Sequence, residues 1–494
     1  MPLTRSTRGT PLVMMRVAVV FVFMLCASLW AGPTVSWAEG SDLQIGVLSD
    51  THVHLEPGDD PAKDGSVARF RRALEYFRER KVDGVLVCGD LTDQGLDIEL
   101  KAVADTWFAV FPDGRLPDGS PVANLMHYGD HDAETRFWNP RKERHLEACA
   151  RLGVTPVRSL SVDENRKTCW EAFFHEVWLP IQVKRVKGRV FVLAHFMRET
   201  AGWNEGLAET LASAGVASDE PFFFSQHRPF KGTAFAKWGP DSGRNEQALQ
   251  QYPNAVAFFG HTHYTLTDDR TVLQRGYTAI NAGALKNQAV DRHHENGLLI
   301  PWIKEDVNRD LDMPCVPEET SQGGMIMRVS GDRIVLERRD FVTGLSLGPD
   351  LSFAVDVSAR RRGDDRASEE KPKGLAPLFP KGAAVRLSRT SAVSRRKRTF
   401  EALRLEFPIA KSVGGHPRAH DYRVCAWTED GRLVKERFVF SPAANRPESC
   451  DKGPVVCLFD VRDLDGAVRF TVEARSCWGR LGAPLSAGLA EKAR

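Results

Sequence analysis

The sequence lacks an excess of charge of either sign, because its 494 residues hold 67 lysines and arginines against 65 aspartates and glutamates, a formal net charge of +2. Proteins that bind nucleic acids usually present a basic surface to the phosphate backbone. The near balance gives no such surface, so no nucleic-acid partner is expected and a nuclease is disfavoured. With 42% hydrophobic and 27% charged residues, the composition is that of an ordinary globular chain with room for roughly two to four domains.

The N-terminal apolar run, residues 17–31, is short for a membrane-spanning helix, which needs about 20 residues. Arginines precede the run and small residues at Ser36 and Ala38 follow it, the pattern of a secretory signal peptide. We therefore expect cleavage after Ala38, a periplasmic or secreted chain, and no stable membrane span afterwards, with an uncleaved anchor as the alternative. Removing three arginines from the 67 basic residues would leave 64 against 65 acidic ones, a net charge near −1.

Cysteine is scarce, with nine in the chain, and eight of them follow residue 38. Export permits disulfides. Cys149 and Cys169 could form one bridge, whereas Cys88 is expected to be a buried thiol on a core strand. Two further bridges, whose pairing the sequence does not fix, are expected among Cys425, Cys450, Cys457 and Cys477.

Five short polar segments each stand where a β-strand would end. Carboxylate oxygens and neutral imidazole nitrogens suit divalent manganese, zinc, iron or cobalt, so cysteine is not required as a ligand. Two ions roughly 3.5–4 Å apart need about seven or eight protein ligand bonds with one shared carboxylate, and the five segments meet that count. In chain order the segments are Asp50-Thr51-His52, Gly89-Asp90-Leu91-Thr92-Asp93, Gly129-Asp130-His131-Asp132, Gln226-His227 and Gly260-His261-Thr262-His263.

Each of these residues also has an ordinary alternative role. Aspartate after a strand often caps a helix or a turn, which would explain Asp50 and Asp90 without a metal. Gly89 and Gly129 argue against that alternative, because a glycine before the polar residue permits a tight bend and a close backbone approach. His227 closes an apolar run, residues 221–224, and this context favours a ligand over an ordinary buried histidine.

The five segments together resemble the signature of the calcineurin-like metallophosphoesterase superfamily, which reads D-x-H, G-D-x-x-[DE], G-N-H-[DE], a lone H and G-H-x-H. The resemblance covers roughly residues 43–345 and departs at Asp130, where the family has asparagine. It implies that the first metal is held by Asp50, His52, Asp90 and His263. It implies that the second is held by Asp90, as the bridging ligand, with Asp130, His227 and His261.

The resemblance also implies roles for two residues that are not metal ligands. His131 would contact the substrate phosphate and assist the leaving group, and Asp132 would orient that imidazole. The implied reaction is attack by metal-bound hydroxide on a phosphate ester, most similar to bacterial phosphodiesterases; the ester would be a small molecule or an envelope component. A phosphomonoesterase or nucleotidase, and a non-catalytic metal-binding module weakened by Asp130, are the alternatives. Asp93 stands where purple acid phosphatases place a tyrosine, which argues against their ferric centre.

The remaining pattern predicts an α/β fold in which, by the resemblance, two facing β-sheets are flanked by helices, followed by a small C-terminal all-β sandwich. We divide the chain into a signal peptide (1–38), a catalytic domain (39–354), a charged linker (355–378) and a sandwich similar to fibronectin type III (379–494). The stretch 134–187 is expected to be an irregular insertion beside the cleft. Core strands are predicted at 43–48, 84–88, 122–128, 189–194, 222–225 and 256–259, and a helix is predicted between the first two.

Overall fold

The structure is a computed structural model, and it describes residues 42–56, 58–133, 162–197, 200, 202–216, 220–233, 242–274, 276–286, 288, 321–355, 375–393, 397–450 and 453–489. Its contacts divide the chain into Met1–Ala38 and Glu39–Arg494, and the second unit contains every element named below. The expected signal peptide and Cys149 lie outside the described residues. Among the helices that are described, none has both the length and the apolar character needed to cross a membrane.

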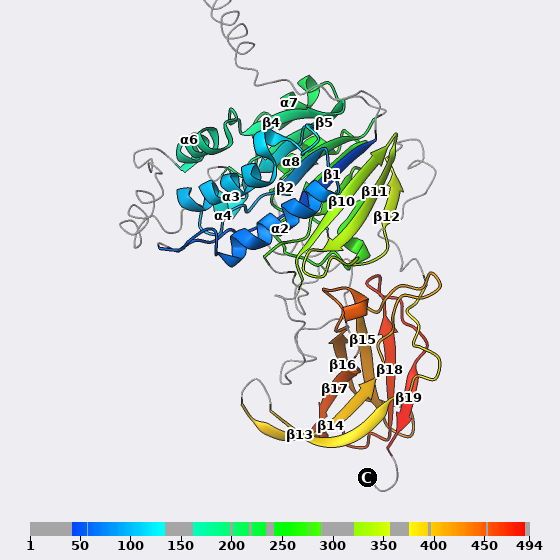
Figure 1. The fold of residues 1–494 in the computed structure, drawn as a ribbon. Coiled ribbons are helices and arrows are strands. Elements are labelled where there is room, and N and C mark those ends of the chain that lie inside the picture. The colour runs from blue at the N-terminus through cyan, green and yellow to red at the C-terminus, as the bar shows by residue number, and fades with distance from the viewer. Residues whose placement is uncertain are drawn as a thin grey trace, which may run out of the picture. The chain divides into compact units, whose positions relative to one another are not determined.

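Two six-stranded sheets carry the first part of the described chain (Figure 1). In the first sheet, three neighbouring parallel strands meet an antiparallel hairpin, in the order β12-β11-β10-β1-β2-β3. The buried strands are continuous apolar runs, as expected of parallel strands covered on both faces. The strands are β1 (Leu43–Leu48), β2 (Gly84–Cys88), β3 (Ala123–His127), β10 (Gly323–Ser330), β11 (Arg333–Asp340) and β12 (Leu351–Ala354).

The second sheet has the order β4-β5-β6-β7-β9-β8, with parallel pairing from β5 to β9 and an antiparallel strand at each edge. Every core strand predicted from the sequence is present within one residue of its expected bounds. The strands of this sheet are β4 (Ile181–Val186), β5 (Arg189–Ala194), β6 (Phe222–Ser225), β7 (Ala255–Phe259), β8 (Val272–Gln274) and β9 (Thr278–Asn281).

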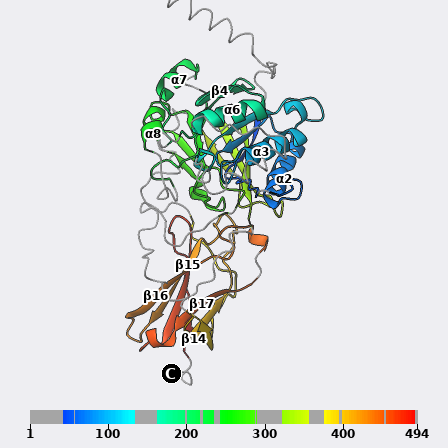
Figure 2. The same cartoon turned by 90° about the vertical axis from the view of Figure 1, so that its left-hand side faces the viewer.

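Helices cover the outer faces of the two sheets, with α2 and α3 on one side and α7 and α8 on the other (Figure 2). The predicted helix is α2, whose buried stripe includes Phe70, Leu74 and Phe77. Gly46 of β1 leaves room for that stripe, since a Cβ there would lie 2.6 Å from the Phe77 ring. The helices are α2 (Gly65–Glu79), α3 (Asp97–Val110), α4 (Asp130–Ala133), α6 (Val162–Phe174), α7 (Leu207–Ser213) and α8 (Arg244–Leu249).

The stretch 134–187 is more regular than expected where it is described, because it contains helix α6 and the edge strand β4. Helix α6 is fixed to α3 by a buried ion pair in which Arg166 Nη2 lies 2.8 Å from Asp97 Oδ1. Residues 134–161 lie outside the described residues. The expectation of an irregular insertion was therefore wrong for 162–186, where a charged helix and an edge strand carry little apolar pattern.

The C-terminal part forms two antiparallel sheets, of three strands (β13-β14-β17) and four strands (β16-β15-β18-β19), which share one apolar core. Its strands alternate inward and outward residues, as the sequence predicted for a sandwich. They are β13 (Arg386–Val393), β14 (Thr399–Phe407), β15 (Asp421–Trp427), β16 (Leu433–Phe440), β17 (Val455–Asp460), β18 (Arg469–Arg475) and β19 (Leu485–Gly488).

The disulfides expected in this part are not formed, since no described cysteine is in a disulfide. Cys457 of β17 belongs to the core between the two sheets. Cys425 of β15 alternates with the core residues Val424 and Ala426, so its side chain lies on the opposite face of its sheet, away from Cys457. Cys169 donates its thiol hydrogen to Asp97 Oδ1 at 3.2 Å.

Candidate metal centre

The predicted ligands follow the carboxyl ends of five core strands, β1, β2, β3, β6 and β7, where open α/β sheets place their sites. Five of the seven have a left-handed backbone, with φ of 51° at Asp50, 42° at His52, 50° at Asp90, 69° at His261 and 51° at His263. Such conformations cost about 1–3 kcal/mol each for residues other than glycine, and they cluster at functional sites. Backbone hydrogen bonds from the amides of Asp50 and His52 to the carbonyls of Gly89 and Asp90, 3.1 and 3.0 Å long, hold two of them.

Glycines let these strand ends approach one another closely. A Cβ on Gly129 would lie 2.2 Å from Asp90 Oδ1, and one on Gly89 would lie 2.5 Å from His227 Nδ1. A Cβ on Gly260 would lie 2.6 Å from an Asp50 carboxylate oxygen. All three distances are shorter than real Cβ contacts, so the glycine in each block is required by the packing of ligands against backbone.

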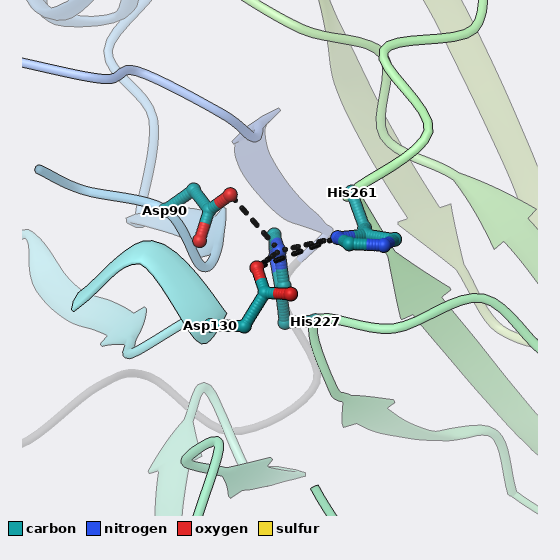
Figure 3. A group of neighbouring side chains, drawn as sticks. All are labelled: Asp90, Asp130, His227 and His261. Carbon is teal, nitrogen blue, oxygen red and sulfur yellow. Dashed lines mark hydrogen bonds and ion pairs between the residues drawn. The ribbon is translucent and has the colours of Figure 1, made fainter. Parts of the chain in front are cut away.

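One group of ligand atoms forms around His227 (Figure 3). Its Nε2 lies 3.1 Å from Asp90 Oδ2, 3.1 Å from Asp130 Oδ1 and 3.3 Å from His261 Nδ1. Its Nδ1 is 2.8 Å from the carbonyl oxygen of Cys88 and therefore carries the hydrogen. The lone pair of Nε2 is thus directed at the other three side chains, as a metal-ligating histidine requires.

A second group combines Asp50, His52 and His263. His52 donates from Nδ1 to Asp93 Oδ1 at 2.9 Å, which leaves its Nε2 as an acceptor 3.0 Å from His263 Nε2. His263 Nε2 is also 3.3 Å from Asp50 Oδ1. These ligand atoms converge from separate loops, so the residues fit a divalent cation.

The same oxygen of Asp90 reaches both groups. Its Oδ2 lies 3.5 Å from His52 Nε2 and 3.1 Å from His227 Nε2. A carboxylate that bridges two ions must occupy this position. The structure thus brings all seven predicted ligands together in two groups, with Asp90 between them.

The charges of the two groups are strongly coupled. Burial raises the pKa of the Asp50 carboxyl, but His263 and the neighbouring imidazoles outweigh it and hold that pKa well below its usual range. Burial also raises the pKa of the Asp130 carboxyl, but His227 and His261 outweigh burial and lower that pKa. The carboxylates therefore stay ionised at neutral pH and are ready to bind cations.

His131 lies beside the first group, with its ring centroid 4.6 Å from that of His52. Its backbone amide donates to Asp90 Oδ1 at 2.9 Å, and its Nδ1 donates to the carbonyl oxygen of Asp93 at 2.7 Å. Burial lowers the pKa of His131, but Asp90 and the Asp93 carbonyl outweigh burial, so the pKa is raised and the imidazolium is favoured.

The carboxyl group of Asp132 faces the backbone of the ligand loops. Its buried carboxylate accepts hydrogen bonds from the amides of Leu91, Thr92 and Gly129 at 2.7–3.1 Å and from the Thr92 hydroxyl. It therefore ties the ligand loops after β2 and β3 together, while the Asp93 carbonyl orients His131.

Three charged residues near the ligands had no role in the sequence analysis. Asp93 accepts from His52, and Lys286 Nζ lies 2.6 Å from the same Asp93 oxygen. Arg228 Nη2 lies 3.2 Å from Asp130 Oδ2. Arg228 directly follows the ligand His227, and Asp93 is the last residue of the second polar segment, so the sequence pattern could have indicated both. Lys286 is far from these segments in the sequence, and the fold places it beside them through the hydrogen bond from its amide to the Asp50 carbonyl.

Comparison with known proteins finds a family match for part of this chain. Residues 43–265 match the family described as calcineurin-like phosphoesterase. No curated protein matches the chain. Among solved structures, a dimetal phosphatase from Danio rerio is 15% identical with a TM-score of 0.34, covering 64% of this chain and 99% of its own. A purple acid phosphatase from yellow lupin is 14% identical with a TM-score of 0.38, covering 65% and 55%.

A third solved structure is vacuolar protein sorting 29 from Cryptosporidium parvum, which is 14% identical with a TM-score of 0.29 and covers 63% of this chain and 98% of its own. The matched segment 43–265 begins at β1 and extends past Gly260, so it contains all five ligand-bearing blocks. Residues 43–265 are thus a calcineurin-like phosphoesterase domain, and with the Asp/His ligand set that it carries the protein is a metal-dependent phosphoester hydrolase.

Proposed function

We propose that the protein is a dinuclear phosphoesterase that hydrolyses a phosphate ester, with a phosphodiester as the preferred class. The observation that carries the proposal is the position of Asp90 Oδ2, within 3.5 Å of one imidazole from each ligand group. A single ion would not need two sets of ligands that share one oxygen. Divalent manganese, zinc, iron or cobalt held there would polarise a phosphoryl oxygen and lower the pKa of bound water.

The chain's own residues supply the rest of the chemistry. His131 is held by its Nδ1, so Nε2 is the nitrogen with which it can donate to a phosphate oxygen or to the leaving group. Asp90 and the Asp93 carbonyl raise the pKa of His131, which favours the protonated imidazole that a general acid needs. Asp93 links both histidines, because its side chain accepts from His52 and its carbonyl accepts from His131.

The setting is also a proposal. The N-terminal pattern supports export to the periplasm or the medium, where the substrate would be a small phosphate ester or an envelope component. The C-terminal sandwich contains seven antiparallel strands around one core, which agrees with a fibronectin type III-like module. Its proposed role is a scaffold beside the catalytic domain.

The test uses the chain from residue 39 onwards, loaded with manganese or with zinc. We expect two metal equivalents by elemental analysis and faster turnover of bis-p-nitrophenyl phosphate than of p-nitrophenyl phosphate. His131→Ala should lower kcat by about 10²–10⁴ without releasing metal, because general acid catalysis contributes that much. His175→Ala, at an exposed histidine, is the matched control.

Two results would refute parts of this proposal. Protein with both metals bound that turns over neither compound, nor a panel of natural phosphate esters, would not be an enzyme of this class. Faster turnover of the monoester would replace the phosphodiesterase with a phosphomonoesterase or nucleotidase.

A further inference from the structure

The two oxygens of the Asp130 carboxylate have different partners. Oδ1 lies 3.1 Å from His227 Nε2 and 3.4 Å from His261 Nδ1, inside the second ligand group (Figure 3). Oδ2 lies 3.2 Å from Nη2 of Arg228. The side chain of Asp130 is 7% exposed, so solvent does little to screen either contact. One oxygen therefore belongs to the metal site and the other to an arginine.

Arg228 is held in place by more than this ion pair. Its guanidinium lies 4.9 Å from the ring centroid of Phe196, a position typical of a cation–π contact. Phe196 is itself fixed, because it is 7% exposed and its amide donates to the carbonyl of Tyr128 at 3.0 Å. The carbonyl of Arg228 accepts from Gln226 Nε2 at 2.7 Å. Backbone and guanidinium are thus both positioned.

An amide at position 130 would carry no charge, whereas a carboxylate adds one negative charge to a buried site that already holds Asp50 and Asp90. An extra buried anion weakens the positive field that an anionic phosphate requires. It can also bind an ion through both oxygens, which would occupy a coordination position. The contact with Arg228 offsets both effects. The guanidinium supplies a positive charge beside the carboxylate, and its hydrogen bond to Oδ2 opposes binding of an ion through that oxygen.

We propose, building on the proposed dinuclear phosphoesterase, that Arg228 is a positioning residue that restricts Asp130 to ligation through Oδ1 and restores the positive charge that this aspartate removes. With a divalent ion held by the second ligand group, this contact would leave only Oδ1 of Asp130 to bind the ion. The guanidinium also adds to the positive field at the second site, so its removal should weaken the binding of a dianionic ester more than that of a monoanionic one.

The experiment is a double-mutant cycle with the wild type, Arg228→Gln, Asp130→Asn and the double variant, all in the chain from residue 39 onwards. Manganese affinity is measured by calorimetric titration. In the wild-type background, Arg228→Gln should tighten manganese binding at the second site about tenfold, because both oxygens of Asp130 become available. In the Asp130→Asn background, the same change at Arg228 should alter the affinity less than about threefold, because the amide has only one oxygen to offer.

Activity gives a second readout. Arg228→Gln should raise KM more for the dianion p-nitrophenyl phosphate than for the monoanion bis-p-nitrophenyl phosphate, and Arg228→Lys should recover part of that loss because it keeps the charge. Arg244→Gln is the matched control, since Arg244 is an exposed arginine whose guanidinium lies 4.4 Å from the Trp203 ring.

Several outcomes overturn the inference. Weaker manganese binding in Arg228→Gln together with a lower Tm would show that Arg228 only supports the fold. Equal effects in the two backgrounds would show that it does not act through Asp130. If the wild type binds metal but hydrolyses no ester, the proposed function fails while the coupling in metal affinity still decides the role of Arg228.

Discussion

Replacing Asp93 by alanine tests whether the metal affinity of the first ligand group depends on a residue outside that group. The side chain of Asp93 accepts from His52 Nδ1 at 2.9 Å and from Lys286 Nζ at 2.6 Å. Burial raises the pKa of Asp93, but these two hydrogen bonds outweigh burial and lower it, so the side chain is ionised at neutral pH. Without it, His52 loses the partner that keeps the hydrogen on Nδ1 and the lone pair on Nε2.

Loss of such an outer partner typically costs about 10–100-fold in metal affinity or activity. Because the Asp93 side chain is 20% exposed, we expect the lower end of that range, about tenfold, which corresponds to about 1.4 kcal/mol. The measurement is a manganese titration followed by calorimetry. The alanine variant keeps the backbone carbonyl that holds His131, so the loss should appear in the first site while the second site keeps its affinity.

The matched control is Asp105→Ala. Asp105 is 63% exposed, lies 2.7 Å from Lys101 one helical turn away, and belongs to α3 outside the ligand loops. It should leave both affinities unchanged. If Asp93→Ala binds both equivalents as tightly as the wild type, the tautomer of His52 is set by something else and the reasoning is wrong.

Three further predictions concern stability and packing. Gly129→Ala should displace the Asp90 carboxylate, lower the free energy of unfolding by about 1–3 kcal/mol and weaken metal binding. Gly65→Ala is the control, because a Cβ at Gly65 meets nothing within 4 Å and should change neither quantity. Equal denaturation midpoints for the two variants would contradict this prediction. Burial lowers the pKa of His127 to about 3, so the folded state stays unprotonated while the unfolded chain gains a proton below pH 6.5. The contribution of His127 to the free energy of unfolding is therefore fully present above pH 6.5, and it falls by up to about 1.4 kcal/mol per pH unit as the pH drops towards 3. In urea titrations of metal-free protein, His127→Gln should make the free energy of unfolding less dependent on pH over this range. Arg475→Met should cost about 3–5 kcal/mol, because it strands the buried Asp421 carboxylate that Arg475 Nε approaches at 2.7 Å; an unchanged Tm would refute it.

Much of the metal centre could be predicted from the sequence because its ligands are single residues at strand ends with distinctive chemistry. The orientation of His131 could not, since it depends on a backbone carbonyl, and every residue has one. The contacts of Asp132 with backbone amides of the neighbouring loop could not be predicted either, because no motif letter encodes the direction of a side chain. Arg228 adjoins a ligand, yet only the fold shows that its guanidinium meets Asp130 and not solvent.

The fold was predictable where strands are buried and apolar, and it was missed where they are not. β13, with the sequence RLSRTSAV, is largely exposed, and β4 alternates charged and apolar residues at a sheet edge. Such edge strands lack the continuous apolar run by which the core strands were found. No described cysteine is in a disulfide, and proximity in sequence does not show which face of a strand a cysteine occupies.

The backbone of the ligand loops is held by contacts within the protein itself. Five of the ten non-glycine residues with positive φ in the described part of the chain are candidate metal ligands. That strain is maintained by hydrogen bonds between loops, by the Asp132 carboxylate and by glycines that tolerate no Cβ. Ions entering such a site have little loop structure to create, so the seven ligands define where they bind. We expect selectivity among substrates to depend on the charged residues around the candidate ligands, Arg228, Lys286 and His131. Each of these side chains has more than one hydrogen-bond donor, and the structure places one donor of each on Asp130 or Asp93.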